Sequence, residues 1–137
     1  MSPSLALSLP PLRILIVDDE LDNRELLQIV LRWEGFETST AGSGEDALAQ
    51  VAAHAPDLVL LDLMMPGLDG CEVTLQLKAN LATRHIPVLI ISAMDDRDTR
   101  IRVLGAGAVD FIAKPIDRFD LCQRVRSVLG LQALPAA

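Results

Sequence analysis

Five short apolar segments recur along the chain, and each is followed by a turn and then by a stretch with helical periodicity. The segments are residues 14–17, 36–40, 58–61, 88–91 and 111–113. They are rich in leucine and β-branched residues, which is typical of strands. The first, third and fourth are almost wholly apolar, as expected of strands buried on both faces. The second contains Glu, Thr and Ser, so it is predicted to lie at an edge of the sheet.

The stretches between these segments have the spacing and end signals of helices. Apolar residues at helical spacing predict the first helix, and they are Leu26, Leu27, Val30 and Leu31. This helix is expected to end at Gly35, because glycine commonly terminates helices. Ser43, followed by Asp46, is a predicted cap for a helix over residues 47–53. Three more helices are predicted at residues 70–79, 96–104 and 118–129, and Gly130 ends the last of them.

Alternating strands and helices of this kind close with right-handed crossovers into a parallel sheet that helices cover on both faces. Five strands are too few for an eight-stranded barrel. The predicted fold is therefore α/β and flavodoxin-like: a doubly wound, (βα)5, parallel five-stranded sheet in the order 2-1-3-4-5. Sheets of this topology bind ligands beyond the carboxyl ends of their strands, at the switch point between strands one and three.

The chain has 137 residues, of which 50% are hydrophobic and 23% are charged, a composition typical of one globular domain. Residues 12–130 are expected to form this domain, with residues 1–11 as a flexible lead-in. The tail, residues 131–137, is too short for an output domain. The apolar runs are far shorter than the ~20 residues that cross a bilayer, and no basic residue precedes Arg13. A cytoplasmic protein without a membrane span is predicted.

The charge distribution limits which partners are expected, and the cysteine content indicates the redox state of the compartment. The formal net charge is −7, and residues 1–94 hold 13 of the 19 acidic residues but only 5 of the 12 basic ones. Direct DNA binding is not expected, because it needs a concentrated basic face. Cys71 and Cys122 lie singly within predicted helices, so buried free thiols in a reducing compartment are the expected state.

Polar side chains directly follow four of the five predicted strands. They are Asp18 and Asp19 after the first strand, Asp62 after the third, Ser92 after the fourth and Lys114 after the fifth. Singly, each has an ordinary explanation as a helix cap, a turn residue or a solvated amine. Together they are expected to converge at the edge where this topology binds ligands.

The chemistry of these side chains favours a hard divalent cation and a phosphoryl group. Three carboxylates in one place repel one another unless a cation lies among them. Mg²⁺ prefers oxygen ligands and often binds one or two carboxylates together with a phosphate. No His or Cys follows these strands, which argues against zinc or copper. Lys114 and Ser92 suit the oxygens of a phosphoryl group.

Over about residues 12–129 the chain resembles the receiver domain of two-component response regulators. Four segments carry the resemblance: residues 14–20 (ILIVDDE), 58–70 (LVLLDLMMPGLDG), 86–93 (IPVLIISA) and 107–115 (GAVDFIAKP). The resemblance implies a phosphorylation-dependent switch that is not an enzyme in the usual sense. It accepts a phosphoryl group in a Mg²⁺-dependent reaction and loses it slowly by itself.

The same resemblance implies residue roles at the metal and phosphoryl site. Asp62 is the expected phosphoryl acceptor. Asp19 and Asp62 are expected to ligate Mg²⁺ with the carbonyl of Met64, while Asp18 acts through metal-bound water. Lys114 matches the lysine of the family that contacts the phosphoryl group.

Three further roles follow from the resemblance alone. Ser92 is expected to bond a phosphoryl oxygen, and Phe111 to be the aromatic switch residue on the fifth strand. The bond between Lys114 and Pro115 is expected to be cis. Two departures from many relatives stand out: Phe111 lacks the hydroxyl of a tyrosine, and Met64 and Met94 are apolar where polar residues are common. They are expected to affect kinetics and coupling.

The expected partners are a sensor histidine kinase or phosphotransfer protein and an unidentified downstream protein. The latter would bind the face formed by residues 96–104, 111–113 and 118–129, and a homodimer is left open. This face carries six arginines, most of them expected to be solvated and paired with nearby acids: Arg97, Arg100, Arg102, Arg118, Arg124 and Arg126 with Asp96, Asp98 and Asp120.

Two other functions compete with the switch. A Mg²⁺-dependent aspartyl-phosphate phosphohydrolase would be expected to carry a second acid two residues after Asp62, where Met64 stands. A flavin or nucleotide carrier would need a glycine-rich turn after the first strand, where residues 18–20 are all acidic and would repel a phosphate.

Overall fold

A computed structural model describes residues 10–132, so most of the predicted lead-in and tail lies outside the described residues. The division of the chain at residues 12 and 130 stays a prediction. All strand pairs are parallel, and the order β2-β1-β3-β4-β5 confirms the predicted topology. The strands are β1 (Arg13–Val17), β2 (Glu37–Ala41), β3 (Leu58–Asp62), β4 (Val88–Ser92) and β5 (Asp110–Ala113).

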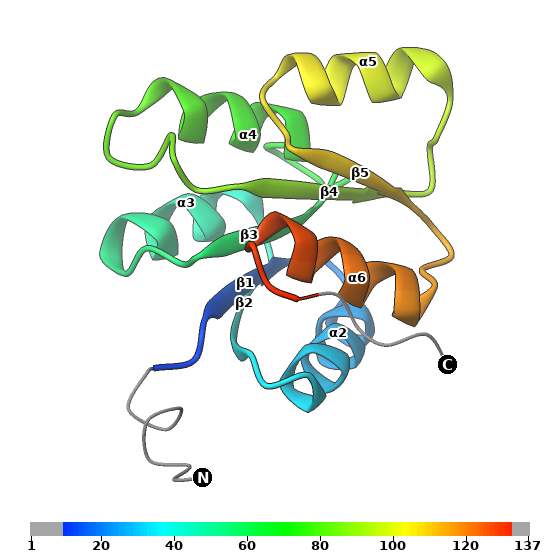
Figure 1. The fold of residues 1–137 in the computed structure, drawn as a ribbon. Helices are drawn as coiled ribbons and strands as arrows, with labels where there is room; N and C mark the ends of the chain where they lie inside the picture. Colours follow the sequence, from blue (N-terminus) through cyan, green and yellow to red (C-terminus); the bar gives the residue numbers. More distant parts are fainter. Residues whose placement is uncertain (1–9, 133–137) are drawn as a thin grey trace, which may run out of the picture.

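Within residues 10–132, five helices cover the two faces of the sheet. They are α2 (Leu21–Trp33), α3 (Gly44–Ala53), α4 (Gly70–Ala79), α5 (Arg97–Gly105) and α6 (Arg118–Val128). Helices α2 and α6 pack on one face, while α3, α4 and α5 pack on the other (Figure 1). Each face therefore has its own apolar cluster, as expected for a doubly wound sheet.

The polarity of the strands sets their places in the sheet. Every residue of β3 and β4 is buried, whereas β2 is exposed or partly buried at all but its last residue. The polar strand lies at an edge, as predicted, because only an edge strand has a side that no neighbour covers. The observed strand bounds differ from the predicted ones by one residue at several ends, because the end of backbone pairing does not coincide with a change in side-chain polarity. Helix α3 begins at Gly44, three residues before the predicted start.

Local signals at the helix ends are confirmed. Gly35 and Gly130 have positive φ angles of 95° and 72°, which glycine adopts without steric cost. The side chain of Ser43 accepts a hydrogen bond from the amide of Asp46 and caps α3. The apolar stripe of α2 is only partly inward, since Leu27 and Leu31 are buried but Leu26 is 61% exposed.

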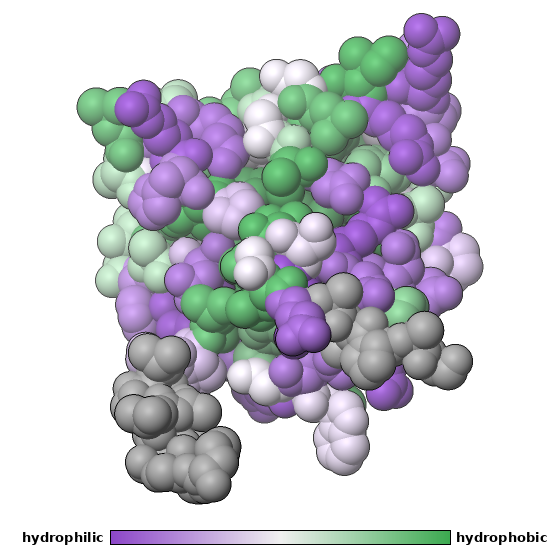
Figure 2. All heavy atoms as spheres, viewed as in Figure 1, coloured by the Kyte–Doolittle hydropathy of each residue, from purple (hydrophilic) through white to green (hydrophobic). Residues whose placement is uncertain are grey.

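The predicted pairing of the arginines is only partly correct. Arg124 pairs with Asp120, as expected, but the carboxylate of Asp96 caps α5 by accepting from the amide of Thr99. On α5, Arg100 instead lies near Asp95, and Arg102 near Asp69. The Asp96 carboxylate is occupied by the amide and hydroxyl of Thr99, so nearness in sequence did not identify the partners of the arginines on α5. Hydrophilic residues gather at the beginning of α5, at the upper right of Figure 2.

Both cysteines are free and buried, as predicted. In residues 10–132, no helix has both the length and the apolarity that crossing a membrane requires.

Candidate functional site

Three aspartates meet at the carboxyl ends of β1 and β3. The strands are paired in register, with Val17 opposite Leu61, so the residues that follow on each strand are neighbours. Carboxylate oxygens of Asp18, Asp19 and Asp62 all lie within 4.8 Å of one another. Asp18 and Asp62 are 2% and 6% exposed, whereas Asp19 is exposed. The predicted convergence of these three acids is therefore present in the fold.

Lys114 brings a positive charge to the same place from the end of β5. Its amide donates a hydrogen bond of 2.9 Å to the carbonyl of Ser92, which continues the pairing of β5 with β4 past the last strand residue. Its Nζ lies 3.6 Å from Oδ2 of Asp62 and 3.7 Å from Oδ2 of Asp18. The single amine thus faces two buried carboxylates and cannot neutralise both.

The charge balance of the site appears in the pKa of Asp62, which is raised from its ordinary value of 3.8 to about 6. Burial is the largest cause, and the charge of Asp18 and, more weakly, that of Asp19 act in the same direction. Lys114 and the amide of Met64, which donates to Oδ1 of Asp62 at 3.3 Å, lower the pKa. Asp62 is mostly ionised at neutral pH, although burial and repulsion by the two neighbouring carboxylates both disfavour its charged form.

Two residues of α2 that were not predicted fix the loop after β1. The Asn23 side chain donates to Oδ2 of Asp18 at 3.3 Å, and the guanidinium of Arg24 donates to the carbonyl of Asp18 at 2.7 Å. The amide of Glu20 donates to Oδ1 of Asp18 at 2.9 Å. Polar residues in the first turn of a helix are too common for their spacing from Asp18 to have indicated these contacts.

The other residues predicted from the resemblance are Ser92, Phe111 and Pro115. Ser92 ends β4 and is fully buried, and its Oγ accepts a hydrogen bond of 3.0 Å from the amide of Met94. Phe111 is not part of the cluster: its ring is buried in the apolar layer on the α3, α4 and α5 side of the sheet. The bond between Lys114 and Pro115 is cis, as the resemblance implied.

The two methionines flank the cluster with exposed side chains, 53% for Met64 and 47% for Met94. Met64 contributes its backbone amide to Asp62, and Met94 contributes its backbone amide to Ser92. Neither thioether is a strong ligand or hydrogen-bonding group.

The donor set fits a hard divalent cation. All three acidic side chains offer oxygen, and the charges of Asp18 and Asp19 add to the burial that raises the pKa of Asp62, so a cation among them would relieve their repulsion. Mg²⁺ accepts such ligands while retaining several waters, which suits a cluster with one exposed carboxylate.

A family model for the response regulator receiver domain matches residues 14–126. The chain belongs to the response regulator receiver domain family. Over 116 residues this receiver domain is 52% identical to the response regulator PleD of Caulobacter vibrioides, covering 85% of the chain and 26% of PleD. It is 44% identical over 117 residues to the DNA-binding response regulator MtrA of Mycobacterium tuberculosis, covering 85% of the chain and 50% of MtrA.

A solved receiver domain shows the same fold over almost its whole length. It is the signal receiver domain of a signal transduction histidine kinase from Syntrophus aciditrophicus, with a TM-score of 0.81, 31% identity, and coverage of 91% of this chain and 98% of that one. The chain spans about a quarter of PleD and half of MtrA, so their whole-protein activities do not transfer with the family. Receiver domains bind Mg²⁺ at an acidic pocket and act in phosphorylation-dependent signalling, and the aspartate cluster is compatible with both.

Proposed function

We propose that this receiver domain accepts a phosphoryl group on Asp62 in a Mg²⁺-dependent reaction and thereby changes its partner-binding face. The proposal rests on the groups that lie next to the Asp62 carboxylate. A buried carboxylate at a strand end has one amine 3.6 Å away and two further carboxylates within 4.8 Å. These neighbours support the proposal that Asp62 is the nucleophile, that Lys114 is the cation that binds the phosphoryl group, and that Asp18 and Asp19 take part in holding the metal.

The proposed transfer starts from the ionised form of Asp62. A carboxylate oxygen attacks the phosphorus of a phosphohistidine or of a small acyl phosphate, and a P–O bond forms in line with the breaking P–N or P–O bond. The electron pair of the broken bond leaves with the donor. Lys114, whose Nζ already faces Asp62, would bind an oxygen of the transferred group, and the hydroxyl of Ser92 would donate to another.

The residues proposed to hold Mg²⁺ are Asp19 and Asp62 directly, the carbonyl of Met64, and Asp18 through a bound water. When bound, the ion would offset the repulsion between the anionic nucleophile and the anionic donor. Asn23 and the amide of Glu20 keep the carboxylate of Asp18 oriented, because each donates to a different oxygen of it.

The proposed phosphodonor is a helical protein, either a sensor histidine kinase or a phosphotransfer protein. An apolar groove beside the site supports this choice. The groove lies between α2 and the segment after β5, and its lining includes Leu26, Ile29 and Ile116 as well as Asp18 and Lys114. Leu26 and Ile29 are 61% and 67% exposed. An apolar helix face seated there would lie next to the phosphorylation site.

The output partner is proposed to bind the face formed by α5, β5 and α6. It is expected to be a protein, because the net charge of −7 disfavours direct DNA binding by this chain. A homodimer through this face is compatible with the proposal. Free buried thiols suit a reducing cytoplasm, which is where we expect the protein to act.

Intact-protein mass spectrometry after incubation with acetyl phosphate and Mg²⁺ tests the proposal. The wild type should gain one phosphoryl group, the gain should vanish with EDTA, and Asp62→Asn should gain none, because an amide is not a competent nucleophile. Glu25→Gln, which removes an exposed carboxylate of α2, is the matched control and should be labelled normally. Undiminished labelling of Asp62→Asn, or turnover of a panel of phosphomonoesters, would contradict the assignment.

A further inference from the structure

The ammonium of Lys114 is shared by two buried carboxylates. Its Nζ lies 3.7 Å from Oδ2 of Asp18 and 3.6 Å from Oδ2 of Asp62, and these aspartates are 2% and 6% exposed. Because the two distances are nearly equal, they favour neither carboxylate. A further donor that binds one of the two oxygens therefore influences which carboxylate attracts the amine more strongly.

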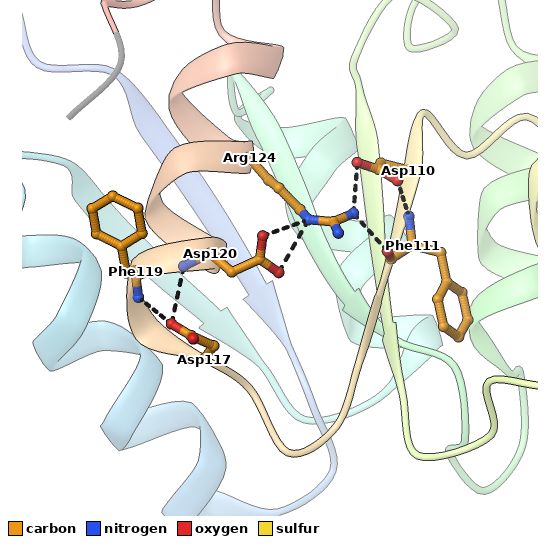
Figure 3. Close-up of polar contacts among 6 residues, drawn as sticks. All are labelled: Asp110, Phe111, Asp117, Phe119, Asp120 and Arg124. Atoms are coloured by element: carbon orange, nitrogen blue, oxygen red, sulfur yellow. Dashed lines mark hydrogen bonds and ion pairs between the residues drawn. The ribbon is translucent and has the colours of Figure 1, made fainter. Parts of the chain in front are cut away.

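The main chain that leads to Lys114 is hydrogen-bonded on both sides of β5. On the β4 side, the amide of Lys114 donates to the carbonyl of Ser92 at 2.9 Å. On the other side, Nη1 of Arg124 donates to the carbonyl of Phe111 and to Oδ2 of Asp110, each at 3.0 Å, as Figure 3 shows. A shift of the ammonium between the two carboxylates therefore needs only rotation about bonds of the Lys114 side chain.

Asn23 is a further donor to one of these oxygens. From the first turn of α2, its side-chain amide donates at 3.3 Å to Oδ2 of Asp18, the same oxygen that Lys114 faces. The partial positive charge of the donor offsets part of the negative charge of this oxygen. The attraction of Asp18 for the ammonium is therefore weaker in the presence of Asn23 than it would be without it.

The proposed phosphoryl transfer requires the ammonium to leave Asp18. In that reaction Lys114 binds an oxygen of the group carried by Asp62, so Oδ2 of Asp18 loses this neighbour. A buried carboxylate oxygen that is left without a donor is unfavourable. Asn23 remains as a donor to this oxygen, which lowers the free-energy cost of releasing Lys114.

We propose that Asn23 is a positioning residue that keeps the ammonium of Lys114 available to the phosphoryl group by binding the oxygen of Asp18 that competes for it. The inference rests on the proposed function for its consequence in the transfer, whereas the positioning itself is a property of the resting protein. Without the amide of Asn23, Oδ2 of Asp18 attracts the ammonium more strongly and holds Lys114 away from Asp62.

The variant Asn23→Ala removes this donor and is expected to leave the loop after β1 in place. The guanidinium of Arg24 still donates to the carbonyl of Asp18 at 2.7 Å, and the amide of Glu20 still donates to Oδ1 of Asp18 at 2.9 Å. Alanine has the highest helix propensity, so α2 should persist. The change is therefore confined to one oxygen of the Asp18 carboxylate.

Hydrogen exchange of the Lys114 ammonium with water measures how firmly the amine is held in the metal-free protein. Lys78 and Lys114 are the only lysines of the chain, so ¹⁵N NMR of lysine-labelled protein gives one side-chain signal for each, and Lys78→Arg assigns them. Exchange of Lys114 should slow about three- to tenfold in Asn23→Ala, the range that one net hydrogen bond provides. The signal of Lys78, which donates to the carbonyls of Arg84 and Ile86, should not change.

Two further variants separate the amide donor from side-chain bulk and from effects on the helix. Asn23→Leu keeps a similar size without the donor and should behave like Asn23→Ala. Gln28→Ala removes an amide from the same helix whose hydrogen bond goes to Oγ1 of Thr38 at 3.2 Å, and it should leave the Lys114 signal unchanged. Unchanged or faster exchange of Lys114 in Asn23→Ala, or wild-type exchange in Asn23→Leu, would overturn the proposal.

The rate of phosphorylation tests what this positioning does for the transfer. At saturating Mg²⁺ and acetyl phosphate, Asn23→Ala should be labelled about three- to tenfold more slowly than the wild type, and Gln28→Ala at the wild-type rate. An unchanged labelling rate in Asn23→Ala would overturn the role of Asn23 in the transfer. If the wild type is not labelled by acetyl phosphate, the proposed function fails, whereas the exchange of Lys114 in the resting protein still decides whether Asn23 positions the amine.

Discussion

Replacement of Asp62 by asparagine is expected to stabilise the metal-free protein. Asp62 is 6% exposed, and burial together with Asp18 and Asp19 raises its pKa from 3.8 to about 6. A raised carboxyl pKa means that the folded state favours the protonated form, so stability is lost as the pH rises from 3.8 through 6. Asparagine is neutral at every pH and keeps an oxygen that can accept from the amide of Met64.

The magnitude follows from the same values. A rise from 3.8 to about 6 corresponds to about 3 kcal/mol at pH 7.5, at about 1.4 kcal/mol for each tenfold change in the equilibrium. The advantage of Asp62→Asn should fall to about half of this at pH 5 and vanish below the unfolded pKa. With a urea m-value of about 2 kcal/mol/M, the unfolding midpoint at pH 7.5 should rise by about 1.5 M.

Urea unfolding in EDTA at pH 7.5 and pH 5 measures this difference, with Glu25→Gln as the control for removal of an exposed carboxylate. Mg²⁺ should stabilise the wild type and leave Asp62→Asn nearly unchanged, since the variant lacks a proposed ligand. Equal midpoints for the two proteins at pH 7.5 without metal, or an advantage of Asp62→Asn that does not shrink at pH 5, would refute the reasoning.

Three other outcomes follow from the site. Lys114→Ala should retain Mg²⁺ binding by calorimetry but lose phosphorylation or its conformational response, because the amine faces Asp62, the proposed phosphoryl acceptor. A normal response would remove Lys114 from the proposed site. Trp33 is 79% exposed and lies at the end of α2 away from the aspartate cluster. Its fluorescence should barely change on Mg²⁺ titration, and strong quenching without aggregation would contradict this placement. The double substitution Met64→Asn with Met94→Glu should speed self-dephosphorylation about tenfold, because polar groups orient attacking water and thioethers do not; equal decay rates of the purified phosphoproteins would exclude this role.

The sequence by itself determined the order of the elements and the place of the site. The periodicity of the hydrophobic residues identified five strands and five helices. The polar residues of the second strand predicted that it lies at an edge of the sheet. Because the carboxyl ends of parallel strands meet at one rim, residues as far apart as Asp18, Asp62 and Lys114 could be expected together. These inferences need only the backbone course, which hydrophobic patterning specifies well.

Only the tertiary structure decided which side chains touch one another and at what cost in free energy. The raised pKa of Asp62 comes from the sum of burial and four neighbours, and no sequence spacing supplies that sum. The hydrogen bond from Asn23 to Asp18 and the stacking of Arg100 over Phe111 join side chains of different elements. The same holds for Arg100, whose acidic neighbour is Asp95, a residue outside the predicted set of Asp96, Asp98 and Asp120. Such contacts depend on rotamers that packing selects, and packing exists only after the strands and helices have assembled.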